Sequence, residues 1–117
     1  MNAAAALLGP ALVAGRGDHP ALLFGDQVIT YADLDAQSNA FADACADLGV
    51  RQGDRVLMMV SDRPQFFIAF LGTMKAGAVA VALNLRLSAE DLKFTIADSD
   101  CRLFVVDPQF LETYAPI

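Results

Sequence analysis

The spacing of hydrophobic residues changes along the chain, and the changes divide it into strands and helices. Two apolar runs, Arg55–Val60 and Ala78–Leu83, do not alternate with polar residues, which is typical of strands that are covered on both faces. A third apolar run covers Arg102–Val106. Helical spacing predicts helices at Tyr31–Leu48, Gln65–Ala76 and from Ser88 onward. This order predicts two consecutive right-handed crossover units, and so an α/β fold with a parallel three-stranded βαβαβ core and helices on both faces.

An N-terminal helix and a short β-hairpin are expected before this core. Ala3–Ala14 is apolar, but Gly9-Pro10 interrupts it and no basic residue precedes it, which favours a short docking helix over a secretory signal. Ala21–Phe24 and Gln27–Thr30 have the composition of two strands joined by a tight turn. We therefore predict an N-terminal helix and loop at residues 1–19 and an α/β subdomain at residues 20–117.

Local signals fix where the helices begin and end. Thr30 and Ser88 each have an aspartate three residues later, the spacing of an N-terminal capping pair. Gly49 and Gly77 are expected to end the first two core helices. Pro108–Tyr114 is predicted to form a last helical turn. The helix at 65–76 is apolar nearly all round and is expected to be deeply packed, and one face of the preceding helix is expected to be formed by Leu34, Ser38, Phe41, Ala42, Cys45 and Leu48.

Composition narrows the class of protein. The 117 residues are 56% apolar, above the roughly 45–50% of ordinary soluble domains, which suggests surface intended for burial against something outside this chain. The net charge is −6 and the eight basic residues are scattered, so nucleic acid is not an expected partner. No apolar run approaches the roughly 20 residues of a membrane span. Cys45 and Cys101 are predicted to be buried thiols, as in a reducing cytoplasm.

The sequence offers almost no catalytic chemistry. His19 is the single histidine, so a histidine-pair zinc site cannot be built, and a surface role is expected for it. Gly72 and Gly77 have part of the spacing of a phosphate loop, but Ala78 follows where lysine is required. No catalytic residue and no metal site are predicted. Ligands of open parallel sheets gather beyond the carboxyl ends of the strands, which lie here at residues 61–63, 84–87 and 107–109.

Two motifs carry a resemblance to a known superfamily. ITYADL at Ile29–Leu34 and MKAGAVAVALN at Met74–Asn84 resemble its first two core motifs. Over residues 20–107 the chain resembles the opening segment of adenylate-forming enzymes, which include acyl- and aryl-CoA synthetases, luciferases and the adenylation domains of peptide synthetases. Asn84-Leu85-Arg86-Leu87 resembles acid:CoA ligases more than peptide synthetases, and GRGDHPAL from Gly15 resembles the benzoate-CoA ligase branch.

The resemblance implies a function that these residues do not carry out alone. Such enzymes join a carboxylate to ATP as an acyl adenylate and then transfer the acyl group to the thiol of CoA. ATP, Mg²⁺ and CoA are therefore expected for a complete enzyme, and no cofactor is expected to be held within this segment, which lacks the family's phosphate loop and catalytic lysine. The resemblance implies an N-terminal scaffold whose partners are the remaining domains. It also implies a contact between Arg86 and a CoA phosphate, whereas a solvated Arg86, or one paired with Glu90, is the alternative.

Two other classes of function stay open. One is a stand-alone α/β interaction module that forms a homodimer or docks on a partner through exposed apolar surface. The other is a small flavodoxin-like or receiver-like binding domain. The absence of an acidic cluster at the strand ends disfavours the receiver, and the absence of a Ser/Thr-rich loop disfavours flavin phosphate binding.

Overall fold

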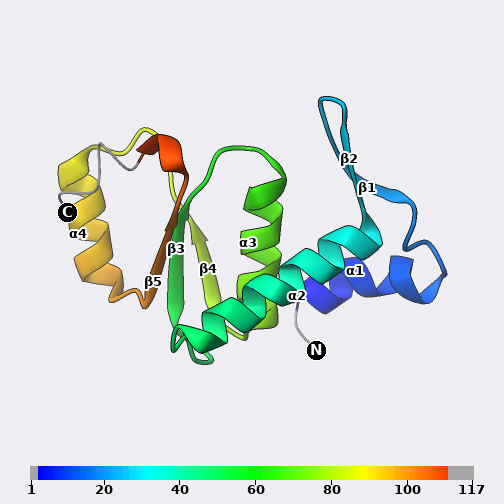
Figure 1. The fold of residues 1–117 in the computed structure, drawn as a ribbon. Helices are drawn as coiled ribbons and strands as arrows, with labels where there is room; N and C mark the ends of the chain where they lie inside the picture. Colours follow the sequence, from blue (N-terminus) through cyan, green and yellow to red (C-terminus); the bar gives the residue numbers. More distant parts are fainter. Residues whose placement is uncertain (1–2, 111–117) are drawn as a thin grey trace.

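The computed structural model describes residues 3–110 and has a parallel three-stranded sheet at its centre (Figure 1). An N-terminal helix and an antiparallel hairpin lie to one side of it. The order along the chain is that predicted from the sequence. The elements are α1 (Ala3–Val13), β1 (Pro20–Phe24), β2 (Gln27–Thr30), α2 (Tyr31–Asp47), β3 (Arg55–Met59), α3 (Pro64–Lys75), β4 (Val79–Ala82), α4 (Ala89–Ser99), β5 (Leu103–Val106) and a 3₁₀ turn, η1 (Pro108–Phe110).

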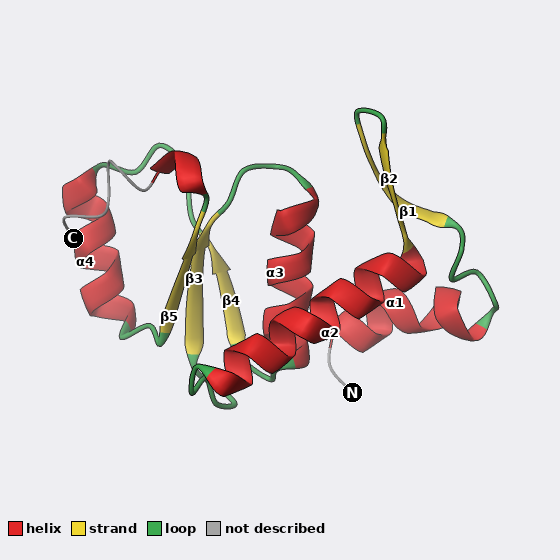
Figure 2. Ribbon diagram, viewed as in Figure 1, coloured by secondary structure: helices red, strands yellow, loops and turns green. Residues whose placement is uncertain are grey.

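The central sheet confirms the predicted parallel core. Its strand order is β4-β3-β5, and Val56 of β3 is in register with Ala80 on one side and Leu103 on the other. Two crossover connections of the same hand, running to opposite edges, place α3 and α4 on opposite faces of the sheet (Figure 2). The four residues from Val56 to Met59 are fully buried because β3 has a strand on each side and helices above and below.

Side chains of β3 divide between two hydrophobic clusters. Val56, Met58 and Val60 pack with Cys45 of α2 and Ala69 of α3. Met59 points to the other face and packs with Leu92 of α4. This alternation along one strand explains why Val56–Val60 carries no polar residue on either face.

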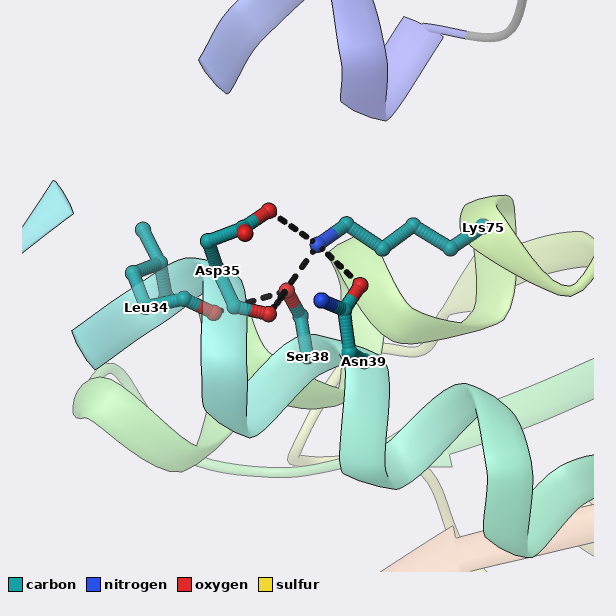
Figure 3. Close-up of polar contacts among 5 residues, drawn as sticks. All are labelled: Leu34, Asp35, Ser38, Asn39 and Lys75. Atoms are coloured by element: carbon teal, nitrogen blue, oxygen red, sulfur yellow. Dashed lines mark hydrogen bonds and ion pairs between the residues drawn. The ribbon is translucent and has the colours of Figure 1, made fainter. Parts of the chain in front are cut away.

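Helices α2 and α3 make the most extensive helix contact in the described chain, and they approach closely at Gly72. A Cβ atom on Gly72 would lie 2.8 Å from Phe41 Cβ and 2.8 Å from the carbonyl oxygen of Ser38. Lys75, at the end of α3, donates hydrogen bonds to the carboxylate of Asp35 (2.7 Å), the backbone carbonyl of Asp35 (3.1 Å) and the side-chain oxygen of Asn39 (2.8 Å) (Figure 3). The ammonium group is therefore satisfied by α2, and it also lies at the end of α3 that the helix dipole makes negative.

Helix α1 and the hairpin form a second packing unit against α2 and α3. Ala4 and Leu8 of α1 are buried in a cluster with Ile29 of β2, Leu34 of α2 and Leu71 of α3. Pro10 lies inside α1. Thr30 ends β2 and caps α2: its hydroxyl accepts from the amide of Asp33 at 3.1 Å, and the Asp33 carboxylate accepts from the amide of Thr30 at 3.4 Å. The predicted capping pair is confirmed.

Four residues are less buried than the sequence-based expectations: Leu48, Phe67, Val79 and Cys101. Leu48 is 65% exposed. Helix α2 ends at Asp47, so Leu48 is no longer part of the helical face that is buried. Phe67 of α3 is 41% exposed, and Val79 is 48% exposed because β4 is an edge strand. Cys101 is only partly buried, whereas Cys45 is buried as expected. Of the predicted turn at 108–114, residues 108–110 form η1 and the rest lie outside the described residues.

None of the helices within residues 3–110 combines the length and the apolar character that crossing a bilayer would need.

Candidate functional site

Two of the three predicted ligand loops meet at the carboxyl edge of the sheet. The loop after β3 and the loop after β5 lie next to each other because β3 and β5 are neighbouring parallel strands. The contact between them is made by Ser61 and Arg63 on one side and Asp107 on the other. The third loop, 84–87, follows the opposite edge strand and contributes no side chain to this contact.

Asp107 is the centre of the arrangement. Its side chain is 2% exposed, and its Oδ2 accepts hydrogen bonds from the Ser61 amide (2.8 Å), the Ser61 hydroxyl (2.7 Å) and the Gln109 amide group (3.3 Å). The other oxygen, Oδ1, forms a short ion pair with the Arg63 guanidinium. We call Ser61, Arg63, Asp107 and Gln109 the Asp107 cluster. Both carboxylate oxygens are thus satisfied by donors from the described chain.

The electrostatics of the cluster favour the charged carboxylate. Burial by itself opposes ionisation and raises the pKa of Asp107. The hydrogen bond from the Ser61 amide, the bond from Arg63, the Ser61 hydroxyl and the positive charge of Arg63 act in the other direction. Together they outweigh burial and hold the pKa of Asp107 below its usual range. A carboxylate with a lowered pKa is a poor general base at neutral pH.

Two depressions border the cluster. The first, about 340 Å³, is lined by the four polar or charged residues of the cluster and by Pro108. The second, about 280 Å³, is a mainly apolar groove between β5 and α3, formed by Phe41, Val60, Ile68, Ala69, Val105 and Val106 and bordered by Arg63. Arg63 Nε is shielded from solvent and has no hydrogen-bond partner among the residues that the structure describes.

This geometry can bind and position, but it contains no catalytic relay. Ser61 donates its hydroxyl hydrogen to an anionic carboxylate of low basicity, and His19 is exposed in the loop before β1. Within residues 3–110 no three histidine, cysteine or acidic side chains gather in a way that could hold a metal ion.

Arg86 lies apart from the Asp107 cluster, in the loop after β4. It is exposed, and no ion pair between described residues includes it or Glu90. Its backbone is held in place: the Arg86 amide donates to Asn84 Oδ1 at 2.9 Å, and the flanking Leu85 and Leu87 pack onto the cluster of α4. Of the two alternatives for this residue, the pair with Glu90 is absent from the described structure.

Sequence reasoning identified the loops of the cluster but not its central residue. The available signal was an aspartate directly after an apolar strand, together with a serine and an arginine directly after the neighbouring strand. Reading these as partners requires the strand order β4-β3-β5, which the order of elements along the chain does not by itself specify.

Comparisons with known proteins agree along the whole chain. Residues 11–116 match the family described as AMP-binding enzyme. The 3-hydroxybenzoate–CoA/4-hydroxybenzoate–CoA ligase of Thauera aromatica is 45% identical over 117 residues, which is 100% of this chain and 22% of that enzyme. The solved structure of the anthranilate CoA ligase AuaEII in complex with anthranoyl-AMP superposes with a TM-score of 0.93 at 28% identity, covering 100% of this chain and 22% of that one.

A third comparison is with a solved structure that contains only the N-terminal domain of its enzyme. The N-terminal domain of FACL13 from Mycobacterium tuberculosis superposes with a TM-score of 0.89 at 31% identity, covering 100% of this chain and 30% of that one. This chain spans about 22% of the length of the Thauera aromatica ligase. With the family match covering nearly every residue, the chain belongs to the AMP-binding enzyme family.

Proposed function

We propose that this chain is the N-terminal scaffold of an ATP-dependent carboxylic acid:CoA ligase and is not catalytic alone. The identity of 45% to a hydroxybenzoate–CoA ligase over every residue of the chain is the observation that carries the proposal. In this reaction ATP and a carboxylate give an acyl adenylate and pyrophosphate, and the CoA thiol then takes the acyl group and releases AMP. An aromatic acid is the proposed substrate class, and the cytoplasm is the proposed location.

The proposed role of the segment is architectural. Its strand β3 is buried from Val56 to Met59, and its helices α2 and α3 are joined by the Lys75 hydrogen bonds and the close contact at Gly72, which suits a support for sites completed by later residues. ATP and Mg²⁺ are assigned to those later residues, since the Asp107 carboxylate is already satisfied by Ser61 and Arg63.

Arg86 is the residue proposed to contact the cofactor. Its guanidinium is exposed and unpaired among the described residues, and Asn84, Leu85 and Leu87 hold its backbone in place. A planar guanidinium with free donors suits phosphate geometry. CoA would supply the thiol that accepts the acyl group, and Arg86 would hold one of its phosphates.

The scaffold proposal is tested by supplying the missing part of the enzyme. The isolated chain is expected to show no ATP–pyrophosphate exchange with 3- or 4-hydroxybenzoate. A chimera, in which this chain replaces the matching segment of the Thauera aromatica relative, is expected to show exchange and thioester formation. Exchange by the isolated chain would refute the scaffold proposal, as would a folded chimera without any activity.

The Arg86 proposal is tested in the same chimera. Arg86→Ala is expected to raise KM for CoA by about tenfold to a hundredfold, since a charge-assisted hydrogen bond contributes about 1.5–3 kcal/mol, and to leave ATP–pyrophosphate exchange unchanged. Arg102→Ala is the matched control, because Arg102 is an exposed arginine in a loose surface pair with Asp54 (3.6 Å). Equal effects of the two substitutions on KM for CoA would contradict the assignment.

A further inference from the structure

The depression of about 340 Å³ at the Asp107 cluster can form hydrogen bonds but carries no net charge. Its lining residues include one cation and one anion, Arg63 and Asp107, and these are paired with each other. Gln109 is exposed and donates to Asp107 through Nε2 at 3.3 Å, which leaves its second amide hydrogen and its Oε1 for a ligand. The Ser61 hydroxyl gives its hydrogen to Asp107 and can still accept one. The depression therefore suits a neutral group that both donates and accepts hydrogen bonds.

Arg86 lies at the same edge of the sheet as this depression. Strands β4, β3 and β5 are parallel, so the loops that follow them leave at one edge, as Figure 1 shows. The outer strands β4 and β5 are two strand spacings apart, which is roughly 10 Å. Leu85 and Leu87 flank Arg86, and they share a hydrophobic cluster with Phe110. Phe110 is the residue after Gln109, so the same cluster supports the loop of Arg86 and the turn of Gln109.

Arg86 and the depression together fit one ligand that carries a phosphate at one end and a neutral hydrogen-bonding group at the other. An adenine nucleotide has this form. Its phosphates suit the free guanidinium, and its adenine and ribose offer donors and acceptors without a charge. We infer that the depression binds the adenosine part of CoA, with Gln109 hydrogen-bonded to the base or the ribose while Arg86 holds a phosphate of the same nucleotide. The inference rests on the proposed function and adds Gln109 as a residue that recognises the cofactor.

The size of the depression agrees with a part of the cofactor rather than the whole. Ligand pockets typically measure about 300–1,000 Å³, and this depression lies at the lower end of that range. The binding of the nucleotide is therefore expected to depend on Gln109, and the binding of the pantetheine arm with its thiol is not. ATP carries the same adenosine, so the test has to distinguish the two cofactors.

The inference is tested by comparing two thiol acceptors in the chimera with the Thauera aromatica relative. Pantetheine carries the reactive thiol of CoA without the nucleotide. Gln109→Ala is expected to raise KM for CoA about two- to tenfold, the effect of losing one neutral hydrogen bond, and to leave KM for pantetheine and KM for ATP unchanged. Gln37→Ala is the matched control, because Gln37 is an exposed glutamine on α2, and it is expected to change none of the three values.

The contrary outcomes separate this inference from the proposed function. An unchanged KM for CoA in the active Gln109→Ala chimera would overturn the inference and leave the proposed function standing. Equal increases in KM for CoA and for pantetheine would show that Gln109 acts through the fold and not on the nucleotide. A raised KM for ATP would assign the depression to ATP. Either of these two results also overturns the inference.

The isolated chain gives a second test that does not depend on an active chimera. Adenosine 3′,5′-bisphosphate, which has the base, the ribose and the 3′-phosphate of CoA, is titrated into the isotope-labelled chain and followed by NMR. It is expected to shift the side-chain amide signals of Gln109 and the Nε–H signal of Arg86, and to leave the amide signals of Gln37 in place. Inorganic phosphate is expected to shift the Arg86 signal alone.

Three results of this titration would overturn the inference. They are a nucleotide that shifts Arg86 but not Gln109, a nucleotide that shifts neither residue, and inorganic phosphate that shifts Gln109 as much as the nucleotide does. Shifts of both residues by the nucleotide, together with a folded chimera that has no activity, would support the nucleotide site and refute the proposed function.

Discussion

Asp107 is both buried and charged, and the residues around it make that combination stable. Three donors from the loop after β3, two from Ser61 and one from Arg63, converge on one carboxylate at the end of β5. Strands β3 and β5 are thereby joined beyond their last ladder hydrogen bonds. The arrangement fixes the start of α3, because Pro64, its first residue, follows Arg63 directly.

Replacing the carboxylate tests this role. Asp107→Asn is expected to lower the free energy of unfolding by roughly 2–3 kcal/mol, because the amide cannot neutralise Arg63 and leaves buried donors without acceptors. The value is below that of a fully buried pair, since Arg63 is 34% exposed and partly screened. Urea unfolding followed by circular dichroism measures it. Asp98→Asn, an exposed carboxylate in α4, is the control and is expected to change stability by less than about 0.5 kcal/mol.

The pH dependence of stability follows from the lowered pKa of Asp107. A carboxylate whose pKa is lower in the folded than in the unfolded chain stabilises the fold fully above the unfolded value, about 3.9 for aspartate. This contribution is lost as the pH falls below that value and through the lower pKa of the folded state. The difference in urea midpoint between the wild-type chain and Asp107→Asn is therefore expected to be constant from pH 7 to about pH 5 and to shrink below about pH 4. A difference that grew on acidification would contradict the assigned charge state.

At the scale of single residues, the sequence predicted caps better than clusters. Thr30 and Asp33 were recognisable because a capping pair depends on a spacing of three residues within one helix. The Asp107 cluster joins positions 44 and 46 residues apart, so no local spacing identifies it. Likewise, Lys75 was placed correctly at the helix end, but its three acceptors on α2 become visible only when the two helices are packed.

Among the described elements, α2 and α3 share the most extensive contact. At Gly72 the two helices approach so closely that a methyl group would lie 2.8 Å from Phe41 and from the carbonyl oxygen of Ser38. The same helix carries Lys75, which reaches across to Asp35 and Asn39. Because α2 begins at the end of the hairpin, this contact also determines where the hairpin and α1 lie relative to the sheet.

Two glycine substitutions separate packing from helix propensity. Gly72→Ala is expected to lower the free energy of unfolding by about 1–3 kcal/mol, since overpacking outweighs the helix propensity gained. Gly9→Ala in α1 is the matched control: apart from its chain neighbours, a methyl group added at Gly9 would meet no atom within 4 Å, and because Pro10 disfavours a helical residue with a Cβ before it, the gain in helix propensity is offset and the change is expected to alter stability by less than about 1 kcal/mol. Urea midpoints of the two variants measure both effects. Stabilisation by Gly72→Ala would show that the helices do not touch there.

Element types and order were predictable, whereas the degree of burial was not. As predicted, helix α3 ends just before Gly77 and strand β4 follows almost at once, with Gly77 at a φ of +80°. Val79 and Leu48 were wrongly expected to be covered, because an apolar run reports what a strand or helix can bury and not whether a neighbour is present. Both residues lie at borders, Val79 on an edge strand and Leu48 just past a helix end.

On the scale of the whole molecule, the described chain exposes much apolar surface. Between residues 3 and 110, large apolar side chains with more than a third of their surface exposed occur in α1, the hairpin, α3, β4 and α4 and just after α2; they are Leu7, Val13, Leu23, Phe24, Val28, Leu48, Phe67, Val79 and Phe94. Leu23, Phe24 and Phe67 border a shared depression of about 230 Å³ between the hairpin and α3. Patches of this kind mark surfaces that other protein covers.

This exposure predicts how the isolated chain behaves in solution. It is expected to bind the hydrophobic dye ANS while folded, and the combined substitutions Leu23→Ser and Phe67→Ser are expected to lower the dye fluorescence by removing two walls of one depression. Val13→Ser is the control, because Val13 is 90% exposed and does not line that depression. A folded isolated chain without ANS fluorescence would show that the depression is closed, and sedimentation velocity would then show whether a homodimer closes it.

The family and the α/β class were recognisable from 117 residues because both motifs encode local structure, and the order of strands and helices along the chain indicates the fold class. The strand order, and therefore the site at the carboxyl edge, required the coordinates.

That order has a consequence for the newly made chain. β3 leaves the ribosome before β4 and β5, its two neighbours in the sheet. Until both have emerged, the apolar run Val56–Met59 has no neighbouring strand, and we expect the nascent chain to be prone to aggregation there unless the earlier helix α2 or a chaperone covers the run.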